Sequence, residues 1–186
     1  MSVIEPDDSF ERLWTFQSQA IVPELATGER FFADWRRTPA NWKPAYMWMK
    51  RQLDRKSGIN VLHPPIWCWH SCEGVWQGPP TVGTACMLLA ADEIQRGMVA
   101  MELLVPTELV LLSSYEHWNT FVDVFIKTRR LPSHRHRRQR MFAEPLLSHD
   151  CDSIQAVIPF IEPAWVQRSF ELVTDGRDWG EPIFET

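Results

Sequence analysis

The sequence predicts one α+β domain, in which a mixed, mostly antiparallel sheet has amphipathic helices packed alongside it. The run Met98 to Val105 is apolar except for Glu102, which is typical of a strand buried in the middle of a sheet. Segments of helical and of strand periodicity are mixed along the chain. They do not alternate regularly as strand and helix, which favours α+β over a parallel α/β sheet.

The first predicted elements are a strand and a helix. Residues 12–17 alternate with period two, which places Thr15 and Gln17 on the same face of a strand. Ser18 is the expected N-cap of the helix that follows, and Gly28 is its expected end.

A second helix and a second strand come next. Apolar residues recur at helical spacing from Trp42 to Leu53, and Ser57-Gly58 closes that helix. Residues 65–72 then alternate as a strand. One face of this strand carries Trp67, Trp69 and Ser71, and the other carries Ile66, Cys68, His70 and Cys72.

The remaining elements surround the central run. Residues 73–83 contain three Gly and two Pro and are expected to form a loop, and residues 86–97 a short helix. After the central strand, residues 109–112 form a short apolar run, and Ser113-x-x-Glu116 predicts the capping box of a helix. This helix has a broad apolar face that is expected to pack on the sheet, made of Trp118, Phe121, Val122, Phe125 and Ile126. Two late strands are predicted, at residues 154–160 and 164–172, with Glu162-Pro163 between them.

The chain of 186 residues is predicted to be a single domain. Residues 1–11 are expected to be a loose leader, residues 12–174 the globular domain and residues 175–186 an irregular tail. No stretch reaches the roughly 18 apolar residues that span a bilayer, and the N-terminus is acidic where a signal peptide is basic. A cytoplasmic location and four reduced cysteines are therefore expected.

Charge is unevenly distributed. Residues 127–140 hold seven Lys or Arg and no acid, and subtracting these from the net charge of −5 leaves −12 for the rest of the chain. The basic segment is a candidate contact for nucleic acid or an acidic protein, and the alternative is a solvated loop. Its candidate binding residues are Arg135, Arg137, Arg138 and Arg140.

Two further patterns bear on chemistry. Cys68, His70 and Cys72 are three potential metal ligands, but neighbours on one strand face lie roughly 6 to 7 Å apart, which is wide for a shared ion. We expect buried thiols beside a hydrogen-bonded His rather than a metal site. Trp67 and Trp69 could stack on a planar ligand or fill the core. Motifs of dinucleotide-binding, P-loop, serine hydrolase and zinc protease sites are absent.

The order of motifs resembles a bacterial family of domains of unknown function over roughly residues 12–170. The resemblance lies in short motifs that occur here in the same order. They are Thr15-x-Gln17, Leu25-x-x-Gly28, Tyr46-x-Trp48-Met49, Pro65-Ile-Trp-x-Trp69 and Val105-Pro-Thr-Glu-Leu-Val-Leu-Leu-Ser113.

A weaker resemblance is to the ADP-ribosyltransferase-like fold. The strand with Thr15 and Gln17 is similar to its NAD-anchoring strand, residues 101–112 to its middle strand, and Gln155-Ala-Val-Ile-Pro-Phe-Ile-Glu-Pro to its closing segment. The resemblance implies NAD as cofactor. It implies Gln155 in the place of the catalytic Glu, with Glu144 or Glu162 supplying a carboxylate.

Two functional hypotheses follow. In the first, the resemblance implies that Gln17, Tyr46, Trp67 and Gln155 line a cleft for NAD or a related nucleotide, with Thr15 and Trp69 as further contacts, and that ADP-ribose is transferred to a macromolecule. Strands 12–17 and 154–160 are then expected to lie side by side around this cleft. In the second, the chain is a non-catalytic binding protein of the defence or toxin-antitoxin kind that uses its basic segment.

Overall fold

A computed structural model describes residues 9–72, 75–128, 130, 140–142, 153–172 and 182–185. It contains one eight-stranded sheet in which every described pair of neighbouring strands is antiparallel. The strands are β1 (Phe10–Ser18), β2 (Ile66–Cys72), β3 (Val75–Trp76), β4 (Met98–Pro106), β5 (Leu111–Ser114), β6 (Ile154–Ile158), β7 (Val166–Glu171) and β8 (Pro182–Glu185).

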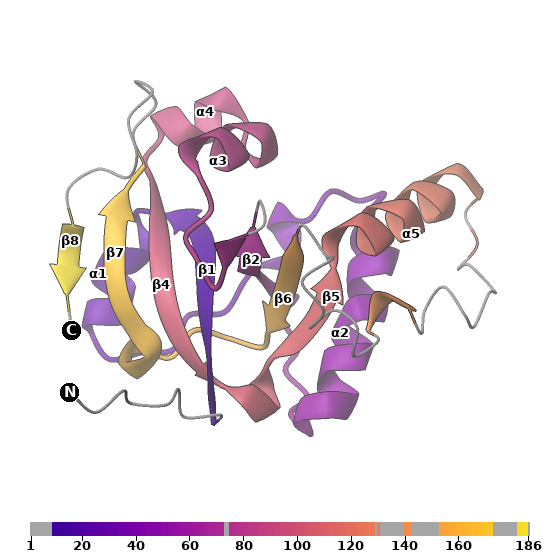
Figure 1. Cartoon of the computed structure of the whole chain (residues 1–186), viewed down its shortest axis with the longest axis horizontal. Helices are drawn as coiled ribbons and strands as arrows, with labels where there is room; N and C mark the ends of the chain where they lie inside the picture. Colours follow the sequence, from indigo (N-terminus) through magenta and orange to yellow (C-terminus); the bar gives the residue numbers. More distant parts are fainter. Residues whose placement is uncertain are drawn as a thin grey trace.

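The spatial order is β5-β6-β2-β1-β4-β7-β8, with β3 paired to β2 (Figure 1). The helices are α1 (Ile21–Ala26), α2 (Lys43–Ser57), α3 (Val82–Leu88), α4 (Ala91–Gln95) and α5 (Tyr115–Thr128). Short 3-10 turns form η1 (Trp35–Arg37), η2 (Thr107–Leu109) and η4 (Pro163–Trp165). The predicted α+β class is confirmed. None of the helices in the described ranges is long and apolar enough to cross a membrane.

The central run is the middle of the sheet, as predicted. β4 pairs with β1 along its whole length, from Phe10 opposite Pro106 to Ser18 opposite Met98, and with β7 on its other side. Met101 and Leu103 are completely buried, and α1 packs against the face of the sheet on which they lie. A strand covered on both faces has no polar side to display, which explains its nearly unbroken apolar sequence.

Helices α2 and α5 form a second part of the core at the β5–β6 end of the sheet (Figure 1). Trp48 and Met49 of α2 meet Trp118 and Phe121 of α5, and all four are buried against Val157 of β6. The ring centroids of Trp48 and Phe121 are 4.5 Å apart. The apolar residues whose spacing predicts the two helices therefore form the faces by which α2 and α5 pack against each other.

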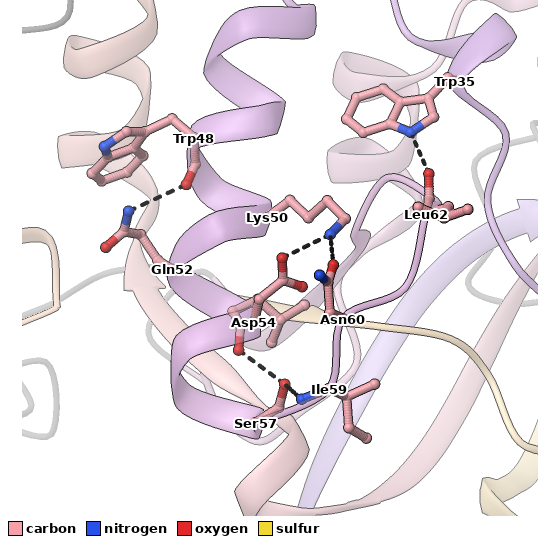
Figure 2. Close-up of polar contacts among 10 residues, drawn as sticks. Trp35, Trp48, Lys50, Gln52, Asp54, Ser57, Ile59, Asn60 and Leu62 are labelled. Carbon is pink, nitrogen blue, oxygen red and sulfur yellow. Dashed lines mark hydrogen bonds and ion pairs between the residues drawn. The ribbon is translucent and has the colours of Figure 1, made fainter.

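The end of α2 is fixed by the contacts drawn in Figure 2. Gly58 has φ 70° in the left-handed region, where glycine pays no steric cost, and this stops the helix. The hydroxyl of Ser57 donates to the carbonyl of Leu53 in the preceding turn. The Nζ of Lys50 donates to Asp54 at 2.7 Å and to Asn60 at 3.0 Å, which holds the chain beyond the helix.

Glu102, the one charged residue in the central run, is buried within an ion triad. Its carboxylate is 1% exposed, on the sheet face that carries Trp14. It accepts a hydrogen bond from Arg12 of β1 and another, at 2.6 Å, from the Nε of Arg168 of β7. Both arginine side chains are about half exposed, at 44% and 47%. The triad supplies the partners that a buried carboxylate requires.

Two predictions about local structure are wrong. Residues 73–83 are not all loop, because Val75–Trp76 forms β3 against β2 and α3 begins at Val82. The hydroxyl that meets the N-terminus of α5 belongs to Ser114, which accepts from the backbone N–H of His117 at 3.3 Å. Ser113 is still within β5, opposite Gln155, and cannot serve as the cap.

The predicted ends of the domain also shift. Phe10 and Glu11, assigned to the loose leader, belong to β1 and pair with β4. Within the predicted irregular tail, Pro182–Glu185 forms β8 against β7. Both differences from the prediction have the same cause. A neighbouring strand supplies hydrogen bonds to a segment whose own sequence shows only a weak strand pattern.

Candidate ligand-binding clefts

The sheet is nearly interrupted between β1 and β2. These two fully described strands pair only where Trp14 lies opposite Trp69, whereas β1 and β4 pair throughout. Past that point the hydroxyl of Thr15 donates to the backbone carbonyl of Trp67 at 2.8 Å, taking the place of a ladder bond. The Nε2 of Gln17 in turn donates to the Thr15 hydroxyl at 2.9 Å. Separation of the strands leaves room for clefts on either side of Trp67.

The first of these, which we call the aromatic cleft, has a volume of about 410 Å³. Four elements contribute its seven aromatic side chains. They are Phe16 of β1, Trp42 and Tyr46 at the start of α2, Trp67 and Trp69 of β2, and Tyr115 and Trp118 of α5. Asn119 and Gln155 are the polar amides at its wall. Volume and lining are typical of a site for a small molecule.

Three of these rings meet in a corner. The centroids of Trp67 and Trp118 are 4.7 Å apart, those of Tyr46 and Trp67 5.2 Å, and those of Tyr46 and Trp118 6.1 Å. The Tyr46 ring is inclined by 56° to Trp67 and by 57° to Trp118. Inclined rings held by a strand and two helices present a fixed concave surface, onto which a planar ligand can stack at little cost in conformational entropy.

A second cleft, of about 500 Å³, adjoins the first. Phe16, Pro39, Tyr46, Trp67 and Leu89 line both. The second cleft differs in carrying charge and polar groups. They include Gln17, Thr38, the carboxylates of Glu24, Asp34 and Glu93, and the guanidinium of Arg37. Trp67 therefore stands at the boundary between an aromatic and a polar compartment.

Two polar groups at this boundary are incompletely satisfied. The indole Nε1 of Trp67 is buried, and no described residue accepts a hydrogen bond from it. Gln155 is 4% exposed and donates through Nε2 to the Ser113 hydroxyl at 3.1 Å, while its Oε1 accepts from no described residue. Buried polar atoms are usually paired, so the Trp67 N–H is a candidate for contact with a ligand, and the Gln155 amide is a candidate because it lines the aromatic cleft.

The predicted cofactor-binding residues are thus partly brought together. Tyr46 and Trp67 line both clefts, Trp69 and Gln155 line the aromatic cleft, and Gln17 lines the second. Thr15 lines neither, because its side chain is 1% exposed and bridges the two strands. The expectation that strands 12–17 and 154–160 lie side by side is wrong, since β2 lies between β1 and β6.

The remaining predicted residues lie elsewhere or cannot be placed. Glu144, Arg135, Arg137 and Arg138 fall outside the described residues, so the basic-segment hypothesis stays a prediction. Arg140 is exposed and lines a separate hollow of about 250 Å³ beside α5, with Glu116 and His117.

Four of the seven aromatic residues of the aromatic cleft were not predicted for it. They are Phe16, Trp42, Tyr115 and Trp118. Trp42 and Trp118 occur in the patterns that predict helix faces, and the same pattern describes a face packed against protein and one that borders a cleft. The high tryptophan content is the one signal in the sequence that could have pointed to them.

The alternation predicts that Cys68, His70 and Cys72 lie on one face of the strand. This prediction is wrong. A register shift between Trp69 and Ser71 turns Cys72 toward Trp14 and Trp69, whereas Cys68 stays in the opposite core cluster. His70 is buried beside the hydroxyl of Ser71, at 2.8 Å from its Nδ1. No group of three potential ligands gathers within the described part of the chain.

Burial perturbs two groups at the aromatic cleft. It raises the pKa of the Tyr46 hydroxyl from 10.0 to about 12, and the pKa of the Cys68 thiol from 9.0 to about 12, where a hydrogen bond with Thr15 acts in the opposite direction. Both groups therefore stay protonated and neutral at pH 7. Cys68 is expected to be unreactive as a nucleophile.

These shifts predict a loss of stability at alkaline pH. Between about pH 9 and pH 12 the unfolded chain releases the Cys68 and Tyr46 protons while the folded chain keeps them, so stability falls as pH rises. Each group contributes a slope of up to about 1.4 kcal/mol per pH unit. Urea unfolding at pH 8 to 11 measures this. The slope should become shallower in Tyr46→Phe, and an unchanged slope in that variant would contradict the assignment.

The chain is an α+β domain with two adjoining clefts at the place where β1 and β2 of its antiparallel sheet stop pairing. The chain belongs to the family described as "Domain of unknown function (DUF3841)", whose model matches residues 12–179. No curated protein and no solved structure matches the chain.

Proposed function

We propose that this protein is an ADP-ribosyltransferase-like domain that binds NAD or a related nucleotide in the two adjoining clefts. One observation carries the proposal. Gln17, Trp67 and Gln155, far apart in the sequence, line two clefts that share Trp67 as a common wall. The resemblance to the ADP-ribosyltransferase-like fold singles out two of these positions, Gln17 and Gln155, and Trp67 is a ring available for stacking between them.

The aromatic cleft fits the planar ring of such a ligand. The corner of Tyr46, Trp67 and Trp118 offers inclined faces for stacking. A carboxamide on the ring can donate to the free Oε1 of Gln155, and a small rotation of Trp67 would let its buried N–H donate to an acceptor on the ligand. The ring contributes apolar contact, and these groups fix its orientation.

The sugar and phosphate part would extend into the second cleft. Arg37 is the cationic side chain among the described residues that line that cleft, and Gln17 and Thr38 offer neutral hydrogen-bonding groups. The neighbouring carboxylates oppose a pyrophosphate, so Arg37 and the solvent are expected to bear most of its charge. Binding is therefore expected to depend more on the ring than on the phosphates.

Transfer of ADP-ribose requires more than binding. A carboxylate stabilises the cationic sugar in the transition state, and a neutral amide such as Gln155 can orient the ribose but cannot supply that charge. None of the described residues at the aromatic cleft is an Asp or Glu. In this proposal Glu144 or another acidic side chain supplies the charge when transfer occurs.

Thermal unfolding with NAD tests the proposal. At ten times Kd, NAD should add about 1.4 kcal/mol of stability, a rise in Tm of roughly 3–6 °C for a chain of this size. Trp67→Ala should abolish most of this rise, because it removes the ring that both clefts share, and Gln17→Ala should reduce it, because it removes one hydrogen-bonding group of the second cleft.

Trp76→Ala is the matched control, because Trp76 lies on β3 and lines neither cleft. It should keep the full response to NAD. The proposal fails if millimolar NAD leaves the Tm of the unsubstituted protein unchanged.

A further inference from the structure

One half of a sheet face lies open. Strands β1 and β4 place six side chains on this face, namely Phe10, Arg12, Trp14, Glu102, Leu104 and Pro106. Toward the end of the strand pair at Met98, α3 and α4 pack on the same face through Ala85 and Ile94. At the opposite end, none of the helices in the described part of the chain lies over the strands (Figure 1). Phe10 is 46% exposed there, so a ligand can reach its ring.

Two arginines on this face share one carboxylate. The Nη1 of Arg12 donates to the Oε1 of Glu102, and the Nε and Nη2 of Arg168 both reach Oε2 at 2.6 Å. A guanidinium has five N–H groups, so Arg12 keeps donors at Nε and Nη2, for which no acceptor lies among the described residues. The triad therefore carries one positive charge in excess. Because the register places Glu185 of β8 opposite Arg168, Arg12 is expected to hold more of this excess.

We propose that this open half, which we call the arginine face and define by Phe10, Arg12, Leu104 and Arg168, binds single-stranded nucleic acid. The two arginines bind neighbouring phosphates through their remaining donors, and a base stacks on the exposed ring of Phe10. The inference does not depend on the proposed NAD site, because both clefts are lined by the other end of β1, from Phe16 onward.

The geometry favours a nucleotide unit over an anion alone. Phe10 and Arg12 are neighbours on one strand face, roughly 6 to 7 Å apart, so a phosphate and the base on the same sugar can contact both at once. Glu102 is 1% exposed and holds Arg12 in place, which reduces the conformational entropy that binding would cost. Single strands offer the ring faces that a duplex keeps stacked. The net charge of −5 opposes a polyanion, so binding is expected to be weak.

Fluorescence anisotropy of a labelled oligothymidylate of about eight nucleotides, titrated with the full chain, tests the inference. With two phosphates bound, the slope of log affinity against log salt should be about −1.4, a loss of about sevenfold between roughly 50 and 200 mM salt. Arg12→Gln should halve this slope and weaken binding about tenfold. Phe10→Ala should weaken binding at least about fivefold with the slope unchanged, because it removes stacking and no charge.

Arg36→Gln is the matched control, because Arg36 is an exposed arginine of η1, outside the arginine face, and its removal should leave binding unchanged. A duplex of the same length should bind more weakly than the single strand. Both the salt slope and this preference are measured on the unsubstituted protein, so they do not depend on the folding of a variant.

Three outcomes would overturn the inference. The first is no binding of the oligonucleotide at low salt, and the second is equal affinity for the single strand and the duplex. The third is binding that survives Arg12→Gln unchanged and disappears when Arg135, Arg137 and Arg138 are replaced together, which would place the site on the basic segment.

Discussion

Replacing Arg12 and Arg168 together by methionine is expected to lower the free energy of unfolding by about 3 kcal/mol. The double change leaves the Glu102 carboxylate, 1% exposed, with neither of the arginines that hydrogen-bond to it. A buried charge without a partner costs several kcal/mol. The expected value lies at the lower end of the range for broken buried pairs because both arginines are about half exposed, and water weakens their interactions.

A triple change distinguishes this mechanism from simple loss of contacts. Adding Glu102→Met to the double variant removes the stranded charge, and most of the lost stability should return, since buried ion triads can be replaced by apolar groups at little cost. Arg36→Met is the matched control, because Arg36 pairs with Asp34 on the surface, and its removal should have no measurable effect. Urea unfolding measures all four proteins. A triple variant as unstable as the double one would rule out the mechanism.

Trp118→Ala is expected to lower the free energy of unfolding by about 3–5 kcal/mol, the range for a tryptophan removed from a core. Trp118 is 3% exposed, and its ring contacts Tyr46 of α2 and Trp67 of β2. It also stacks on Phe121 at 5.7 Å, within the cluster that joins α2 to α5. The change leaves a void in that cluster and removes one wall of the aromatic cleft.

Trp76→Ala provides the comparison, because the Trp76 residue is 44% exposed and packs on one side against His70. Its loss should cost less than about 1.5 kcal/mol. Denaturant unfolding of the two variants measures the difference. Equal losses would mean that Trp118 does not connect α5 to the sheet in the way described.

The patterns in the sequence were sufficient for elements that create their own amphipathic or buried face. Alternation predicts β1 and β2, an apolar run interrupted only by Glu102 predicts β4, and helical spacing predicts α2 and α5. They failed where stability comes from a neighbour. Strand β3 has two residues and exists because it pairs with β2, and β8 pairs with β7 in a segment predicted to be irregular. Neither has a periodicity long enough to detect.

The site shows the same division. Tyr46, Trp67, Trp69 and Gln155 were predicted and lie around one cleft, because the resemblance and the strand faces single them out. Trp118 was assigned to the core and lies at the boundary of core and cleft. A helix face looks the same in sequence whether protein or a cavity lies opposite it.

By itself, the sequence determined which side chains share a face, because the repeats of helix and strand are properties of the local backbone. Only the tertiary structure decided which strands are neighbours. It placed β2 between β1 and β6, and it ended the pairing of β1 with β2 beyond Trp14 and Trp69. Pairing depends on contacts between residues that are distant along the chain, and these contacts cannot be predicted from local periodicity. The clefts arise from that separation of strands.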